Sequence, residues 1–203
     1  MSQPLNRNCA LPRLGEVDED GGEFWVENIM MIPGQGRNLS AYERNRTYMN
    51  TAGSGFLDCS FTSGTDLDSD SRSVVATDFN RDGSVDLLVG SVGGGPLRLF
   101  LNNADAKNNF VSISLIGVQS NRAAIGTRVI AECGSKRITR DLFAANGFMG
   151  SAPPEMLIGI GREKQLDRLT VRWPTGKQQV FTDISANARI SITEGEDQFH
   201  ATE

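Results

Sequence analysis

The chain has 203 residues, of which 38% are hydrophobic and 22% charged, so it can bury a core and is neither fibrous nor disordered. Acidic residues outnumber basic ones by 25 to 20, and the net charge of −5 disfavours a surface that binds nucleic acid. The single histidine, His200, lies in a polar stretch near the C-terminus, which disfavours a catalytic triad and a histidine-rich zinc site. No apolar run approaches the roughly 18 residues that a transmembrane helix needs, so we expect no transmembrane segment.

The first half of the chain predicts short strands after a flexible start. Proline, glycine and a cluster of acidic residues predict a flexible N-terminal arm over 1–23. Over 24–103, short apolar runs alternate with turns rich in glycine, asparagine and aspartate and show no sustained helical period, which indicates β-structure. The strands expected there are Phe24–Ile32, Thr47–Asn50, Phe56–Phe61, Ser73–Thr77, Val85–Val89 and Leu97–Leu101.

The second half shows clearer alternation. A polar linker is expected over 104–109, a domain over 110–195 and a C-terminal tail over 196–203. Apolar residues alternate with polar ones, as they do in strands with one buried face; the alternating apolar residues are Val111, Ile113, Leu115, Val129, Ala131, Cys133, Leu169, Val171 and Trp173. About six or seven strands at this spacing predict a small antiparallel β-sandwich, and the fold class is all-β.

Three cysteines, Cys9, Cys59 and Cys133, lie far apart in the sequence and form no Cys-x-x-Cys pair. This pattern favours free thiols, with a single bridge between Cys59 and Cys133 as the alternative.

Residues 78–86 carry the strongest chemical signal in the chain. They place oxygen-bearing side chains at alternate positions, followed by a glycine and another carboxylate. Calcium prefers about six to eight oxygen ligands, and such a loop lets them converge. The predicted ligands are the side chains of Asp78, Asn80, Asp82 and Asp86 and the backbone carbonyl of Ser84. The flanking residues predict strands rather than the helices of an EF-hand, and the alternative is an acidic turn that bonds only to its own amides.

Two regions resemble known families. Residues 75–89 resemble an FG-GAP/VCBS-type repeat, the calcium-loop hairpin of integrin-like β-propeller blades. Four later segments resemble, in order, the ASPIC/UnbV domain of cartilage acidic protein and its bacterial relatives. They are Ser120–Val129, Asn146–Phe148, Ile158–Gly161 and Asp167–Gly176. Because a propeller needs about four blades, the resemblance implies an incomplete propeller-like sheet before an ASPIC/UnbV sandwich. Within that domain, Asn121 and Arg122 are expected to clamp a carboxylate, either inside the fold or on a partner.

These observations favour a non-catalytic calcium-binding module that interacts with another protein, as an accessory or adhesion-type component of a larger assembly. An incomplete sheet edge supports a protein partner, and carbohydrate is a second candidate partner. The alternatives are a hydrolase or transferase that uses carboxylates of the acidic loops, and a purely structural subunit. The resemblance implies an extracellular or periplasmic protein, whereas the first residues hold no signal-peptide core, so a cytoplasmic location is the alternative.

Overall fold

The computed structural model describes residues 44–51, 53–67, 71–91, 97–103, 108–143, 145, 147 and 150–202. The expected arm over 1–23, the expected strand Phe24–Ile32 and residues 104–107 of the expected linker lie outside these ranges. All regular structure in the described ranges is β-strand, which confirms the all-β prediction. The same ranges contain no helix that is long and apolar enough to cross a membrane.

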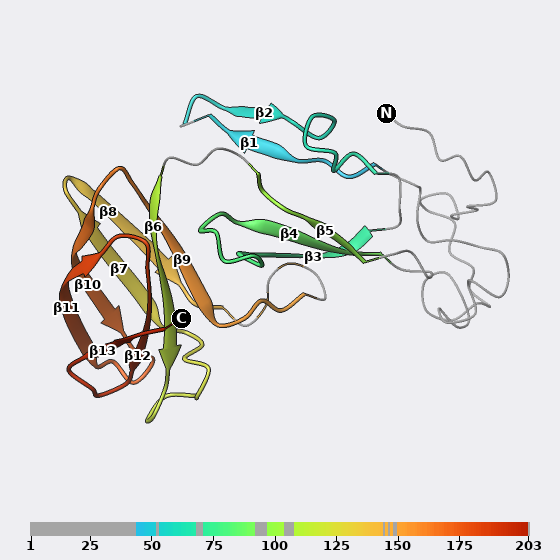
Figure 1. Cartoon of the computed structure of the whole chain (residues 1–203). Helices are drawn as coiled ribbons and strands as arrows, with labels where there is room; N and C mark the ends of the chain where they lie inside the picture. The colour runs from blue at the N-terminus through green and yellow to red at the C-terminus, as the bar shows by residue number, and fades with distance from the viewer. Residues whose placement is uncertain are drawn as a thin grey trace, which may run out of the picture. The chain divides into compact units, whose positions relative to one another are not determined.

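Two small sheets come from the first half of the chain. One pairs β1 (Tyr48–Asn50) with β2 (Phe56–Asp58) in an antiparallel ribbon. The other has the strand order β3-β4-β5 and contains β3 (Ser71–Thr77), β4 (Asp86–Ser91) and β5 (Arg98–Phe100). Neither sheet closes on itself (Figure 1).

The second half forms two four-stranded sheets (Figure 1). The first has the order β11-β10-β7-β8 and contains β7 (Arg128–Cys133), β8 (Lys136–Asp141), β10 (Gln165–Arg172) and β11 (Gln178–Ser185). The second has the order β13-β12-β6-β9 and contains β6 (Asn109–Ile116), β9 (Glu155–Gly161), β12 (Ala188–Thr193) and β13 (Phe199–Ala201). All strand pairs in these two sheets are antiparallel except β6 with β12, which run parallel.

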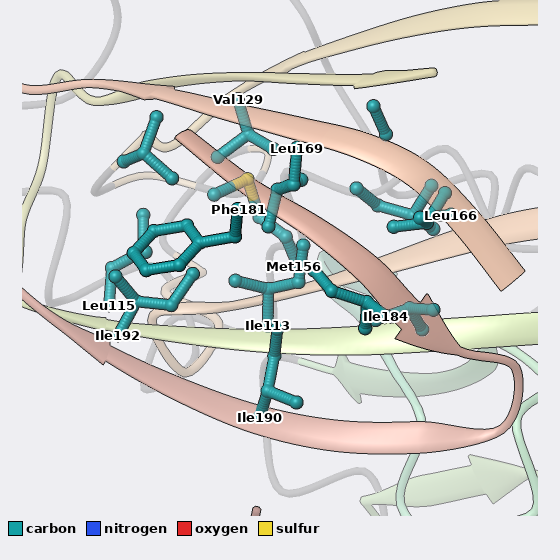
Figure 2. Close-up of a cluster of buried hydrophobic side chains, with 14 of the residues drawn as sticks. Ile113, Leu115, Val129, Met156, Leu166, Leu169, Phe181, Ile184, Ile190 and Ile192 are labelled. Carbon is teal, nitrogen blue, oxygen red and sulfur yellow. The ribbon is translucent and has the colours of Figure 1, made fainter. Parts of the chain in front are cut away.

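One hydrophobic core fills the space between these two sheets, as expected for a β-sandwich. Figure 2 shows its side chains, with Ile113 and Ile190 from one sheet and Leu169 and Phe181 from the other among the labelled residues. Burying one such side chain stabilises the fold by roughly 1.5–3 kcal/mol relative to leaving it exposed. The alternating residues predicted for this core are all buried.

The chain divides into two compact units. One contains Met1–Arg72 and Gly90–Arg98, and the other contains Ser73–Val89 and Leu99–Glu203. The acidic loop between β3 and β4 therefore belongs to the same unit as the sandwich. Both Cys59 and Cys133 are free thiols in the structure.

Two strands of the sandwich were not predicted. In β9, the buried Met156, Ile158 and Ile160 alternate regularly, but Gly159 and Gly161 give the segment the composition of a turn. Strand β13 lies in the polar C-terminal stretch that was expected to be a tail. It pairs with β12 because its first residue, Phe199, packs edge-on against the ring of Phe181, with the ring centroids 6.0 Å apart.

Candidate metal centre

The acidic loop connects two strands of one sheet. Asp78 directly follows β3, and Asp86 is the first residue of β4. The loop is thus flanked by strands, as the sequence predicted, and not by helices. Its tight course relies on a positive φ at Arg81 (65°) and at Gly83 (89°).

Three predicted ligands converge within this loop. The backbone amide of Asp82 donates both to Asp78 Oδ1 (3.0 Å) and to Asn80 Oδ1 (3.2 Å), so these two oxygens lie close to each other. Asn80 Nδ2 donates to Asp82 Oδ2 (2.7 Å), and the amide of Ser84 donates to Asp82 Oδ1 (2.8 Å). The side chain of Asn80 is the main cause that lowers the pKa of Asp82, followed by the Ser84 amide, so that this carboxylate stays ionised.

Asp86 makes its hydrogen bonds outside this group. Its side chain is buried and accepts hydrogen bonds from the amide of Phe79 at Oδ2 (2.9 Å) and from the amide of Asn102 at Oδ1 (2.8 Å). The Asp86 carboxylate therefore links the loop backbone at Phe79 to the backbone at Asn102. Together with the hydrogen bonds above, these contacts are the internal ones expected of an acidic turn without a metal. Among the described residues, no group of three or more histidine, cysteine or acidic side chains is placed to hold a metal ion.

The donor chemistry of the loop nevertheless fits a hard cation. Asp78, Asn80 and Asp82 each supply oxygen acceptors within the loop, and Asn80 and Asp82 are exposed to solvent. Ser84 follows at the position from which a backbone carbonyl would complete the set. Asp86 would bind a cation through the oxygen lone pairs that the amides of Phe79 and Asn102 leave free.

Arg189 and Glu155 also belong to this region, although sequence analysis did not single them out. Arg189 lies on β12 and its Nη2 atom is 2.5 Å from Asp78 Oδ2, an ion pair between residues 111 positions apart in the sequence. Its Nη1 atom is 3.0 Å from Glu155 Oε1. Glu155 also accepts a hydrogen bond from Ser112 Oγ. No short motif could have revealed these contacts, because β12 and the loop meet only through the tertiary fold.

A second group of polar side chains, those of Asn121 and Glu194, forms hydrogen bonds with the backbone of the loop that follows β6. Asn121 does not clamp a carboxylate, since its side chain donates to the carbonyl of Ile125 (2.8 Å) and accepts from the Ile125 amide (2.9 Å). The carboxylate of this loop is that of Glu194, which is 5% exposed and accepts from the amides of Val118, Gln119 and Ser120. Arg122 is exposed. Backbone amides rather than Arg122 therefore hold the carboxylate at this loop, and no ion pair of Arg122 is seen among the described residues.

The fold and the loop define a β-sandwich protein with an oxygen-rich loop between two strands. Residues 117–199 match the family model described as ASPIC and UnbV, from the residue after β6 to the first residue of β13. This match confirms the resemblance that was based on the segments between Ser120 and Gly176. No curated protein matches the chain.

Proposed function

We propose that the protein is a non-catalytic, calcium-binding module that interacts with another protein, as an accessory or adhesion-type component of a larger assembly. Calcium has a structural role in this proposal, and the location is extracellular or periplasmic, as the resemblance implies. The hydrolase or transferase alternative is supported by no specific observation among the described residues.

The observation that carries the proposal is an apolar ribbon exposed to solvent. In β1 and β2, Tyr48 is 56%, Phe56 is 73% and Leu57 is 58% exposed, and Phe61 just beyond β2 is 85% exposed. A two-stranded ribbon is at best marginally stable in water, and by the strand register this one exposes Tyr48 and Phe56 on one face and Leu57 on the other. Exposed apolar surface of this kind marks interaction sites. The ribbon is therefore suited to pack against a protein partner.

The proposal also includes the kind of repeat to which the acidic loop belongs. The segment from β3 through the loop to β4, in which Asp78 and Asn80 converge on one amide, supports an FG-GAP/VCBS-type repeat. The ASPIC and UnbV match of residues 117–199 supports a relationship to cartilage acidic protein. The open three-stranded sheet that carries the hairpin is consistent with an incomplete propeller-like region.

Calcium binding is tested by calorimetry on the full chain after chelation. We expect a calcium-specific heat at about millimolar calcium, the range of many extracellular sites. Asp82→Asn removes one ligand charge from the centre of the loop and should abolish that heat. Asp197→Asn removes the same charge from an exposed position outside the loop and should leave it unchanged. Absence of the heat in the unmodified protein rejects the calcium proposal.

The interaction proposal is tested with Phe56→Ser in the full chain. Phe143→Ser is the matched control, because Phe143 is 71% exposed, against 73% for Phe56, and lies outside the ribbon. We expect one defined protein to co-purify from native extract with the unmodified chain and with Phe143→Ser, and to be lost with Phe56→Ser. Equal recovery with both variants contradicts a role of the ribbon.

A further inference from the structure

Arg189 is the only described side chain that the structure shows bridging the acidic loop and the sandwich by an ion pair. Its side chain is 10% exposed and that of Asp78 is 5% exposed, so both charges are largely removed from water. Glu155 on β9 is the second partner of the same guanidinium. A charge in such surroundings is strongly unfavourable unless it is paired, and here one cation serves two carboxylates.

The contacts of Asp78 fix the direction of its carboxylate. Oδ2 accepts from the amide of Gly83 (2.9 Å) and from Arg189, whereas Oδ1 accepts from the amide of Asp82 beside Asn80 Oδ1. Arg189 thus occupies the oxygen on the sandwich side. The other oxygen, Oδ1, is directed into the loop, where it accepts from the Asp82 amide.

Phe110 completes the connection between the loop and the sandwich. The guanidinium carbon of Arg189 lies 5.4 Å from the centre of the Phe110 ring, a cation–π distance. The same ring lies so close to Gly83 that a side chain at Gly83 would overlap Cδ1 and Cε1 of Phe110. Gly83 of the loop and Arg189 of β12 therefore both lie against the ring of Phe110.

We propose that Arg189 is the positioning residue of the acidic loop: it is an internal counter-ion that keeps the loop folded on the sandwich without calcium and orients Asp78 for the cation. The claim that Arg189 orients Asp78 for calcium rests on the proposed function. The claim that Arg189 holds the loop on the sandwich without metal does not. A protein without this arginine should need calcium to order the loop, because the buried Asp78 would have no other cation.

The test compares two variants of the full chain, Glu155→Gln and Glu155→Gln/Arg189→Met. Neutralising Glu155 in both leaves no unpaired acid on the sandwich, so their difference isolates the pair of Arg189 with Asp78. The readout is hydrogen exchange of the Asp82 and Gly83 amides, which both donate to Asp78, measured by NMR with chelator and with calcium. The amides of Ala131 and Leu169, in paired central strands of the sandwich, report whether the fold is retained.

With chelator, we expect the Asp82 and Gly83 amides to exchange about tenfold faster in the double variant than in Glu155→Gln, with calcium restoring most of the protection. Equal exchange in the two variants overturns the proposal. If the double variant loses the sandwich, Glu155→Gln/Arg189→Gln decides instead, since glutamine keeps a hydrogen-bond donor but removes the positive charge: faster exchange than in Glu155→Gln supports the proposal, and equal exchange overturns it.

Failure of the proposed function gives a different result. If the arginine variant exposes the loop but calcium neither restores protection nor gives heat with the unmodified protein, the calcium proposal fails and the role of Arg189 as internal counter-ion stands.

Discussion

Glu194 shows how a buried carboxylate is stabilised without a basic side chain. Burial by itself raises its pKa, but the amides of Ser120, Val118 and Gln119 and the hydroxyl of Thr175 together outweigh burial and lower the pKa from 4.5 to about 2. The amide dipoles act here as the counter-charge, because several donors converge on one ionised group. The loop after β6 therefore depends on the ionised form of Glu194.

The first prediction is a pH dependence of stability that originates at Glu194. Because the folded pKa lies below the unfolded one, its stabilising contribution is complete above about pH 5 and is lost as the pH falls toward about 2. Glu194→Gln should unfold at a lower temperature at pH 7 and lose less of its stability between about pH 5 and pH 2 than the unmodified protein. Thermal unfolding across this pH range measures both effects, and parallel curves for the two proteins contradict the prediction.

A second prediction concerns Gly83 in the acidic loop. Gly83→Ala combines an unfavourable positive φ with overlap on Phe110, so we expect a destabilisation of about 2–4 kcal/mol in urea unfolding. Gly176→Ala is the control, because Gly176 has a φ of 85° but open space around it. It should cost only about 1–2 kcal/mol. Equal losses for the two variants show that the contact with Phe110 is unimportant.

At the scale of elements, strand β13 illustrates how a short, largely exposed strand is held. It pairs with β12 over three residues, and only its first side chain reaches the core. Partial burial of one aromatic ring, supported by an edge-to-face contact, is enough to hold a strand that is already aligned by backbone hydrogen bonds.

The third prediction follows from this arrangement. Phe199→Ala should destabilise the protein by about 2 kcal/mol, since the ring is only partly buried. His200→Ala, at the neighbouring exposed position, should change the free energy of unfolding by no more than about 0.5 kcal/mol. Urea unfolding of both variants measures the difference, and a large effect at His200 contradicts this account of β13.

The sequence predicts an element where its signal is local. Strict alternation identified β6, β7 and β10, and the spacing of Asp78, Asn80 and Asp82 identified a loop in which these residues do converge. Local signals failed where glycine interrupts the alternation, as in β9, and where a single aromatic residue carries the burial, as in β13. Arg189 could not be predicted at all, because its partners on the loop and on β9 are brought to it only by the complete fold.

At the scale of the whole chain, the acidic loop shares a compact unit with the sandwich. This arrangement gives the fourth prediction, which compares the fragments 71–202 and 110–202. Both should give dispersed NMR spectra, but the shorter one loses Asp78 and should be less stable by about 2 kcal/mol, because Arg189 then has one carboxylate fewer. Equal free energies of unfolding in urea show that the loop does not stabilise the sandwich.

The parallel pairing of β6 with β12 has a consequence for the order of folding. In one sheet, β7 with β8 and β10 with β11 are hairpins of neighbouring strands, which can form soon after synthesis. In the other, β6 is paired on one side with β9 and on the other with β12, where Ile113 lies opposite Ile190. Pairing between strands so far apart in the sequence forms slowly, so the edge of β6 that pairs with β12 stays unpaired until β12 has left the ribosome. During translation, this unpaired edge exposes the nascent protein to aggregation, and a chaperone that covered it would protect the chain.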